Sequence, residues 1–100
     1  MKRMYAMVTR SQLNTIDRGF VTDLRDTLDT YGAPGDPFRD ALDRSELNRV
    51  AHLVADRWEG RESTNGRYSA KYTVEMDWTT NTATVTRFGE QTLICQVRML

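Results

Sequence analysis

The feature that most constrains the fold is a strict alternation of apolar and polar residues over positions 67–78. Successive side chains of a β-strand point to opposite faces of the sheet, so this alternation predicts a strand with one buried face. A buried face has to be covered by a second layer of structure. The apolar members are Tyr68, Ala70, Tyr72, Val74, Met76 and Trp78, and the polar ones are Arg67, Ser69, Lys71, Thr73, Glu75 and Asp77.

The segment before this strand has a helical period that can supply the cover. From Ser11 onward apolar residues recur every three or four positions, which predicts an amphipathic helix of about 20 residues. Thr9 with Gln12, or Ser11 itself, can cap its start, and Gly32 followed by Pro34 ends it. The residues of its apolar face are Leu13, Ile16, Phe20, Leu24, Leu28 and Tyr31.

Two further helices are expected before the alternating strand. Asp36 followed by Pro37 is a start signal for a short helix through Leu42. Ser45 begins a longer helix that Gly60 ends. The apolar face of this longer helix holds Leu47, Val50, Ala51, Val54, Ala55 and Trp58.

The remaining segments are predicted strands. They cover Met4–Thr9, Thr82–Phe88 and Gln91–Met99, with a hairpin turn at 79–82 in which Asn81 accepts a positive φ. The order is therefore β-α-(short α)-α-β-β-β. We expect one α+β domain over residues 1–100, a two-layer sandwich with both main helices on one face of a mainly antiparallel three- to four-stranded sheet.

Charge and cysteine content restrict the function classes. The net charge is zero, which argues against nucleic-acid binding through bulk electrostatics, although residues 17–46 carry eight acids against four arginines. Cys95 is the only cysteine, so an internal disulfide and a zinc cluster are excluded. No stretch has the pattern of a signal peptide or a membrane span, and a cytoplasmic location is expected.

Few residues have the pattern of a catalytic centre, and no cofactor is implied. His52, the only histidine, falls on the predicted solvent face of its helix, and Cys95 lies in an apolar strand where it acts as a small hydrophobic residue. Glu75 and Asp77 share one strand face, as carboxylates do in some metal-dependent hydrolases. No third ligand stands at a telling spacing, so solvent-facing strand charges explain the pair better.

Aromatic residues of the sheet offer a second alternative, a nucleic-acid-binding module that stacks bases on the sheet face. Tyr68, Tyr72 and Trp78 share the parity of the apolar residues, so we expect them to face the helices. Phe88 has the opposite environment and is expected to be exposed. The acidic Glu75 and Asp77 beside such a platform disfavour phosphate binding.

Two residues of the first helix do not fit its amphipathic pattern. Gly19 lies on the polar side, where core packing does not explain a residue that costs a helix interior about 1 kcal/mol. It indicates a tolerated flaw of the helix, a kink, or a close approach of another molecule. Asp17 interrupts the apolar face, and we expect a structural ion pair, with Arg10 as a candidate partner.

Polar helix faces carry the remaining candidate residues. On the second helix Leu53 lies opposite the core face, framed by Arg49 and Arg57, an arrangement common at protein contact points. On the first helix an acidic row is either a solvated face or a docking surface for a basic partner. This row consists of Asp23, Asp26 and Asp29.

The favoured hypothesis is a small non-enzymatic protein-binding module, an inhibitor or adaptor acting on a larger macromolecular complex. Its binding surface is either the acidic helix face or an open strand edge, and the edge would also permit a homodimer. By analogy of size alone, it fits a phage or mobile-element protein that blocks a host defence complex. The nucleic-acid module and the metal-dependent hydrolase remain open.

Overall fold

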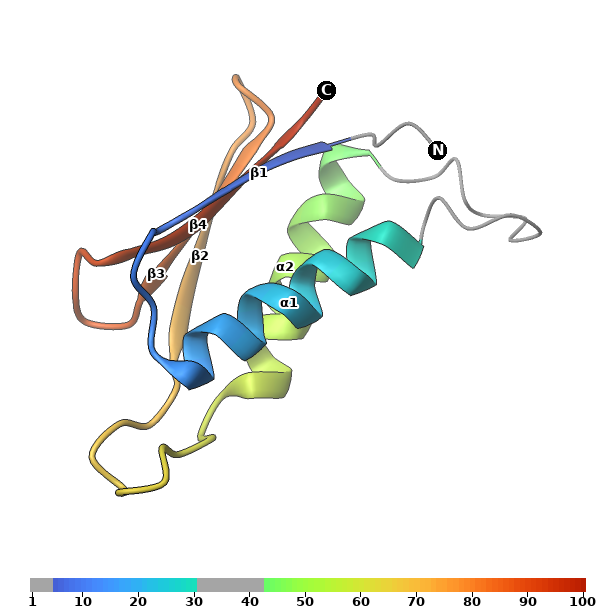
Figure 1. Ribbon diagram of the computed structural model, residues 1–100. Helices are drawn as coiled ribbons and strands as arrows, with labels where there is room; N and C mark the ends of the chain where they lie inside the picture. The colour runs from blue at the N-terminus through green and yellow to red at the C-terminus, as the bar shows by residue number, and fades with distance from the viewer. Residues whose placement is uncertain (1–4, 31–42) are drawn as a thin grey trace.

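Four antiparallel strands form one sheet in the order β1-β4-β3-β2, and two helices cover one of its faces (Figure 1). The computed structural model describes residues 5–30 and 43–100. Its elements are β1 (Tyr5–Thr9), α1 (Thr15–Thr30), α2 (Arg44–Trp58), β2 (Tyr72–Asp77), β3 (Thr82–Arg87) and β4 (Leu93–Met99). The predicted α+β sandwich is confirmed. The expected short helix at 36–42 and the stop signal at 32–34 lie outside the described residues.

The core lies between the helices and the covered face of the sheet. The helices contribute Phe20, Leu24 and Leu28 from α1 with Leu47, Val50 and Val54 from α2, all at most 1% exposed. Val85, Ile94 and Val97 complete the core from the sheet and are fully buried. Burial of this apolar surface, at roughly 25 cal/mol per Å², is the main force that holds the two layers together.

Cys95 is part of this core, as its apolar neighbours predicted. Its side chain is fully buried, and burial raises the pKa of the thiol to about 12. A thiol that stays protonated is a poor nucleophile, so Cys95 is a packing residue.

Both helices start at side-chain caps that differ from the predicted ones. Asn14 accepts a hydrogen bond from the backbone N–H of Asp17 at 2.8 Å, so α1 starts about one turn after the predicted Ser11. Asp43 accepts from the N–H of Glu46 at 2.9 Å, two residues before the predicted Ser45. Asparagine and aspartate cap a helix as well as serine does, so the choice depends on where the chain leaves the preceding segment.

The alternating segment forms a shorter strand than predicted. Strand β2 begins at Tyr72, and the residues before it fold back on the end of α2, where the N–H of Gly60 donates to the carbonyl of Ala70 at 2.8 Å. The parity of the pattern persists, because Ala70 and Tyr72 are buried. It fails at Trp78, which lies beyond the strand end and is 46% exposed.

Candidate functional site

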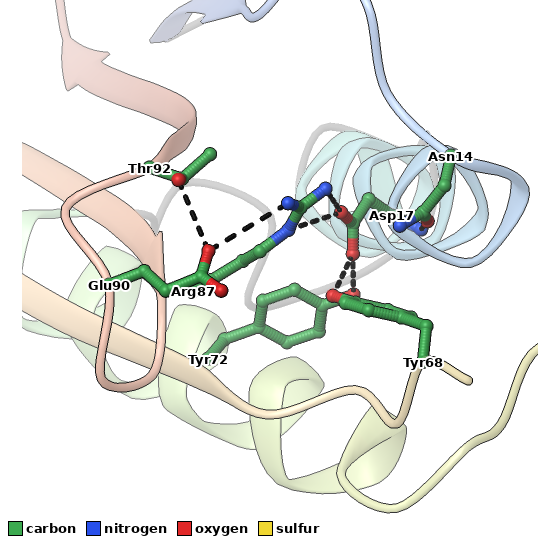
Figure 2. A network of polar contacts seen from close by, with 7 residues as sticks. All are labelled: Asn14, Asp17, Tyr68, Tyr72, Arg87, Glu90 and Thr92. Carbon is green, nitrogen blue, oxygen red and sulfur yellow. Dashed lines mark hydrogen bonds and ion pairs between the residues drawn. The ribbon is translucent and has the colours of Figure 1, made fainter.

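A buried carboxylate stands at the centre of the most extensive polar network in the described residues (Figure 2). Asp17, in the first turn of α1, is fully buried. Its Oδ1 accepts hydrogen bonds from the hydroxyls of Tyr68 at 2.5 Å and Tyr72 at 2.6 Å. Its Oδ2 accepts from Nε and Nη2 of Arg87 at 3.0 and 2.7 Å. Both carboxylate oxygens are therefore occupied by two donors each.

Three separate segments bring these residues together. Arg87 ends β3, Tyr72 begins the neighbouring β2, and Tyr68 belongs to the loop before β2. The Arg87 guanidinium also lies 5.2 Å from the centre of the Tyr68 ring and 3.8 Å from Glu90. The network thus joins the start of α1 to the end of the sheet at which β2 begins and β3 ends.

The network raises the pKa of its two tyrosines and of its arginine. Burial, followed by the hydrogen bond to Asp17, raises the pKa of Tyr72 far above the ordinary tyrosine range, and the same causes raise the pKa of Tyr68. The hydrogen bond to Asp17 raises the pKa of Arg87. These tyrosines therefore stay neutral donors and Arg87 stays charged, which fits a structural tie.

A hollow of about 540 Å³ lies beside the network, between the start of α1 and the loop at 62–65. Tyr68 and Asn14 line it, but the Tyr68 hydroxyl donates to Asp17 and the Asn14 side chain caps α1. These two polar groups at the border of the hollow are therefore engaged inside the protein.

Asp17 forms the structural ion pair that the sequence indicated, but Arg10 is the wrong partner. Arg87, seventy residues further along the chain, takes this place. Sequence reasoning missed Arg87, although one signal was present. Arg87 has the parity of the buried Ala83 and Val85 in β3, so two opposite charges stood at two core positions.

Gly19 is explained by packing, and the expectation that it has no packing role is wrong. A methyl group at this position would stand 2.5 Å from Cη2 of Trp58, on α2. The indole is held in place because its Nε1 donates to Asp23 at 2.7 Å and the Arg61 guanidinium lies 4.1 Å from the ring centre. The close approach at Gly19 comes from inside the protein.

The acidic row on α1 is not a uniform solvent-facing surface. Asp23 accepts a hydrogen bond from Nε1 of Trp58. It also accepts hydrogen bonds from Nη1 of Arg57, which lies 3.0 Å from each carboxylate oxygen, so Asp23 joins α1 to α2. Asp29 accepts the hydroxyl of Tyr5 from β1. Asp26 is exposed. Of the two interpretations of this row, a purely solvated face is wrong for Asp23 and Asp29, because neighbouring elements supply donors to both.

The candidate residues on α2 are also partly engaged. Leu53 and His52 are exposed, as the helical period predicted. Arg49 pairs with Glu46 at 2.7 Å on the same helix, and Arg57 with Asp23. Of the seven residues predicted to bind a partner, Asp26 and Leu53 are the exposed ones whose side chains have no hydrogen bond or ion pair to the described residues. Their role in binding stays a prediction.

The sheet face opposite the helices carries polar side chains in rows across the strands. From β2 it presents Thr73, Glu75 and Asp77, which pair in register with Thr86, Thr84 and Thr82 of β3. Asp77 accepts the backbone N–H groups of Thr79 and Thr80, which lowers its pKa and closes the turn after β2. Glu75 is exposed, and its side chain has no hydrogen bond or ion pair to the described residues.

The aromatic residues do not form a stacking platform on this face. Tyr72 is buried against Phe20, with ring centres 4.2 Å apart, and Tyr68 belongs to the Asp17 network. Phe88 is 58% exposed, as predicted, but lies beyond the end of β3, where Lys71 Nζ is 3.9 Å from its ring centre. The described residues also contain no group of three side chains suited to hold a metal ion around Glu75 and Asp77.

No protein-family model, characterised protein or solved structure was found to match this chain. Within the described residues, neither helix has the length and apolar character needed to cross a bilayer.

Proposed function

We propose that this protein is a non-enzymatic binding module that pairs an extended, basic segment of a partner protein with the free edge of β2. The observation that carries the proposal is the position of β2 at the end of the sheet order, with two carboxylates on its open side. Such a module fits the role of a cytoplasmic inhibitor or adaptor, because strand addition occupies a segment of its partner without chemistry.

Backbone alternation supports a receptive edge. The N–H of Phe88 donates to the carbonyl of Lys71, so the odd-numbered residues of β2 point their backbone groups towards β3. The backbone N–H and C=O groups of Tyr72, Val74 and Met76 then point away from the sheet. Gly60 and Arg61 bond to Ala70 before the strand begins, and Arg44 donates to the carbonyl of Trp78 after it ends, so the strand between them is uncovered by the described residues.

Side chains on the two faces of β2 specify the chemistry of the partner. On the open face, a strand added beside β2 would place its side chains next to Glu75 and Asp77, where lysine or arginine is favoured. On the helix-covered face it would lie beside Val74 and Met76, which are half-buried and pack on the core. The preferred partner segment therefore alternates basic and apolar residues.

The same carboxylates discourage pairing between two copies of this chain. An antiparallel pair of β2 edges would bring acidic side chains of both copies together on the open face, and like charges opposite each other are destabilising. A charged edge therefore selects a basic partner over self-association.

The test uses a peptide of alternating lysine and valine, with a glutamate–valine peptide as its control. We expect the backbone amides of Tyr72, Val74 and Met76 to exchange with solvent in the free protein and to become protected when the lysine peptide is added. Glu75→Lys should weaken binding about tenfold, because it replaces an attraction with a repulsion. Asp56→Lys, the same charge change on the exposed side of α2, should leave binding unchanged.

A second pair of variants separates the edge from general charge. Val74→Pro removes an outward N–H without removing a bond to β3, whereas Val74→Ala retains that N–H and loses similar packing. Binding should be lost in Val74→Pro and retained in Val74→Ala, with thermal unfolding confirming that both fold. Equal binding of the glutamate peptide, or protection confined to the β1 edge, would refute the proposal.

A further inference from the structure

A second surface of the protein has the opposite charge and lies between β1 and α1. A hollow of about 280 Å³ is lined by Arg10, Arg18 and Arg25, together with Thr9, Ser11, Leu13, Val21 and Thr22. No carboxylate lines it among the described residues. Three arginines therefore surround this hollow, although the net charge of the chain is zero.

These arginines have no counter-charge within the described residues. None of the three forms an ion pair there, in contrast to Arg49, Arg57 and Arg87, which all pair with carboxylates. Arg18 donates to the hydroxyl of Thr15 at 3.3 Å and Arg25 to the sulfur of Met7 at 3.7 Å. A guanidinium has five N–H donors, so most donors of this cluster are available to a ligand.

The backbone holds the three arginines close together. Arg18, Thr22 and Arg25 stand at positions i, i+4 and i+7 of α1, which is one face of the helix. Arg10 follows β1, and its N–H donates to the carbonyl of Ile94 at 3.0 Å, which fixes the chain beside that helix face. Two arginines of the cluster therefore stand on α1, and the third follows β1 directly and is held by a backbone hydrogen bond to β4.

We propose that this hollow is a binding site for a phosphate group of a small phosphorylated compound. Arginine matches the geometry of phosphate oxygens with paired N–H donors, and a phosphate dianion has more charge and more acceptors than a carboxylate. The hydroxyl residues Thr9, Ser11 and Thr22 border the same hollow and are suited to the remaining oxygens. The volume suits a phosphate with a small substituent, being just below the range of drug-sized pockets.

The probe is inorganic phosphate, titrated near neutral pH at constant ionic strength and followed by NMR of backbone amides and arginine Nε–H groups. We expect saturable shifts confined to the Arg10–Ser11 segment and to the Arg18–Arg25 face of α1. Acetate, titrated in the same way, should bind at least about tenfold more weakly, because it forms fewer charge-assisted hydrogen bonds.

Arg18→Gln and Arg25→Gln should each weaken phosphate binding about tenfold. Arg67→Gln removes one charge from an exposed position in the loop before β2 and should have no effect. Arg18 is exposed, so Arg18→Gln is expected to fold normally. Arg25→Gln loses the contact of Arg25 with Met7, so Arg18→Gln remains the informative variant if Arg25→Gln is less stable.

Several outcomes would overturn the assignment. These are shifts spread over the whole surface, equal binding of acetate, and an equal loss of affinity in Arg67→Gln. Binding of a single-stranded oligonucleotide with no response to inorganic phosphate would also reject it, because the site would then require a polyanion. The β2 edge is not part of this surface, so either proposal can fail without the other.

Discussion

Asp17 is a fully buried charge whose cost is offset by four hydrogen bonds, two of them from Arg87. A buried ion pair adds little net stability compared with apolar residues of the same size. Loss of one partner is costly, however, because the other charge stays behind without compensation. A change of a single atom is therefore enough to break the network. In asparagine, an amide nitrogen in place of Oδ2 would face the N–H donors of Arg87.

We therefore predict that Asp17→Asn lowers the free energy of unfolding by about 3 kcal/mol. Urea denaturation of the variant and the parent protein measures the difference. Asp26→Asn, on the exposed side of the same helix, is the matched control and should change stability by less than about 0.5 kcal/mol. Similar small effects of both substitutions would contradict the structural role given to Asp17.

Between elements, the contact of α1 with α2 depends on the absence of a side chain at Gly19. Alanine at this position would stabilise an isolated helix by about 1 kcal/mol. In the protein its methyl group would overlap the Trp58 ring, which cannot move freely because Asp23 and Arg61 hold it. Overpacking of this kind costs about 1–3 kcal/mol, so the clash outweighs the gain in helix propensity.

Gly19→Ala is therefore predicted to destabilise the parent protein by about 1 kcal/mol and to stabilise a Trp58→Leu background. The reversal of sign is the readout, and the four proteins of this double-mutant cycle can be compared by thermal or urea unfolding. Destabilisation of the same size in both backgrounds would show that Trp58 is not the obstacle.

At the scale of the whole molecule, the Asp17 network couples global stability to alkaline pH. Tyr72 has a raised pKa in the folded protein, so above about pH 10 the unfolded chain loses this proton while the folded protein keeps it. The unfolded state then binds fewer protons, and stability falls as pH rises. Below the ordinary tyrosine pKa the contribution is fully present.

For Tyr72 alone this slope is about 1.4 kcal/mol per pH unit once the ordinary pKa has been passed. Tyr72→Phe should be less stable near neutral pH, because it removes a donor to a buried charge, and its stability should fall less steeply above pH 10. Urea unfolding of both proteins across the alkaline range checks this difference. Parallel pH profiles would refute the coupling.

The two proposed surfaces differ in charge and lie on different parts of the molecule. Carboxylates stand at the β2 edge and unpaired arginines at the junction of β1 and α1, although the total charge is zero. Electrostatic complementarity contributes to specificity and to association rate. We therefore expect each of the two surfaces to favour a ligand of a different charge.

Local periodicity was sufficient to predict the two-layer α+β fold, the two main helices and the burial of Cys95, and turn chemistry predicted the positive φ of Asn81. The periodic features depend on which residues are three, four or two positions apart. They can therefore be predicted from the order of residues along the chain. Helix starts were less certain, because Asn14 and Ser11 are equally good caps and only the path of the preceding chain distinguishes them.

The partners of the charged and special residues were decided by tertiary structure. Asp17 meets Arg87, Gly19 meets Trp58 and Asp23 meets Arg57 across elements whose relative positions no local pattern specifies. Strand register and the packing of α1 against α2 bring these residues within contact distance. The sequence by itself therefore determined which residues are unusual, whereas the packing of the layers determined which of them remain free to bind another molecule.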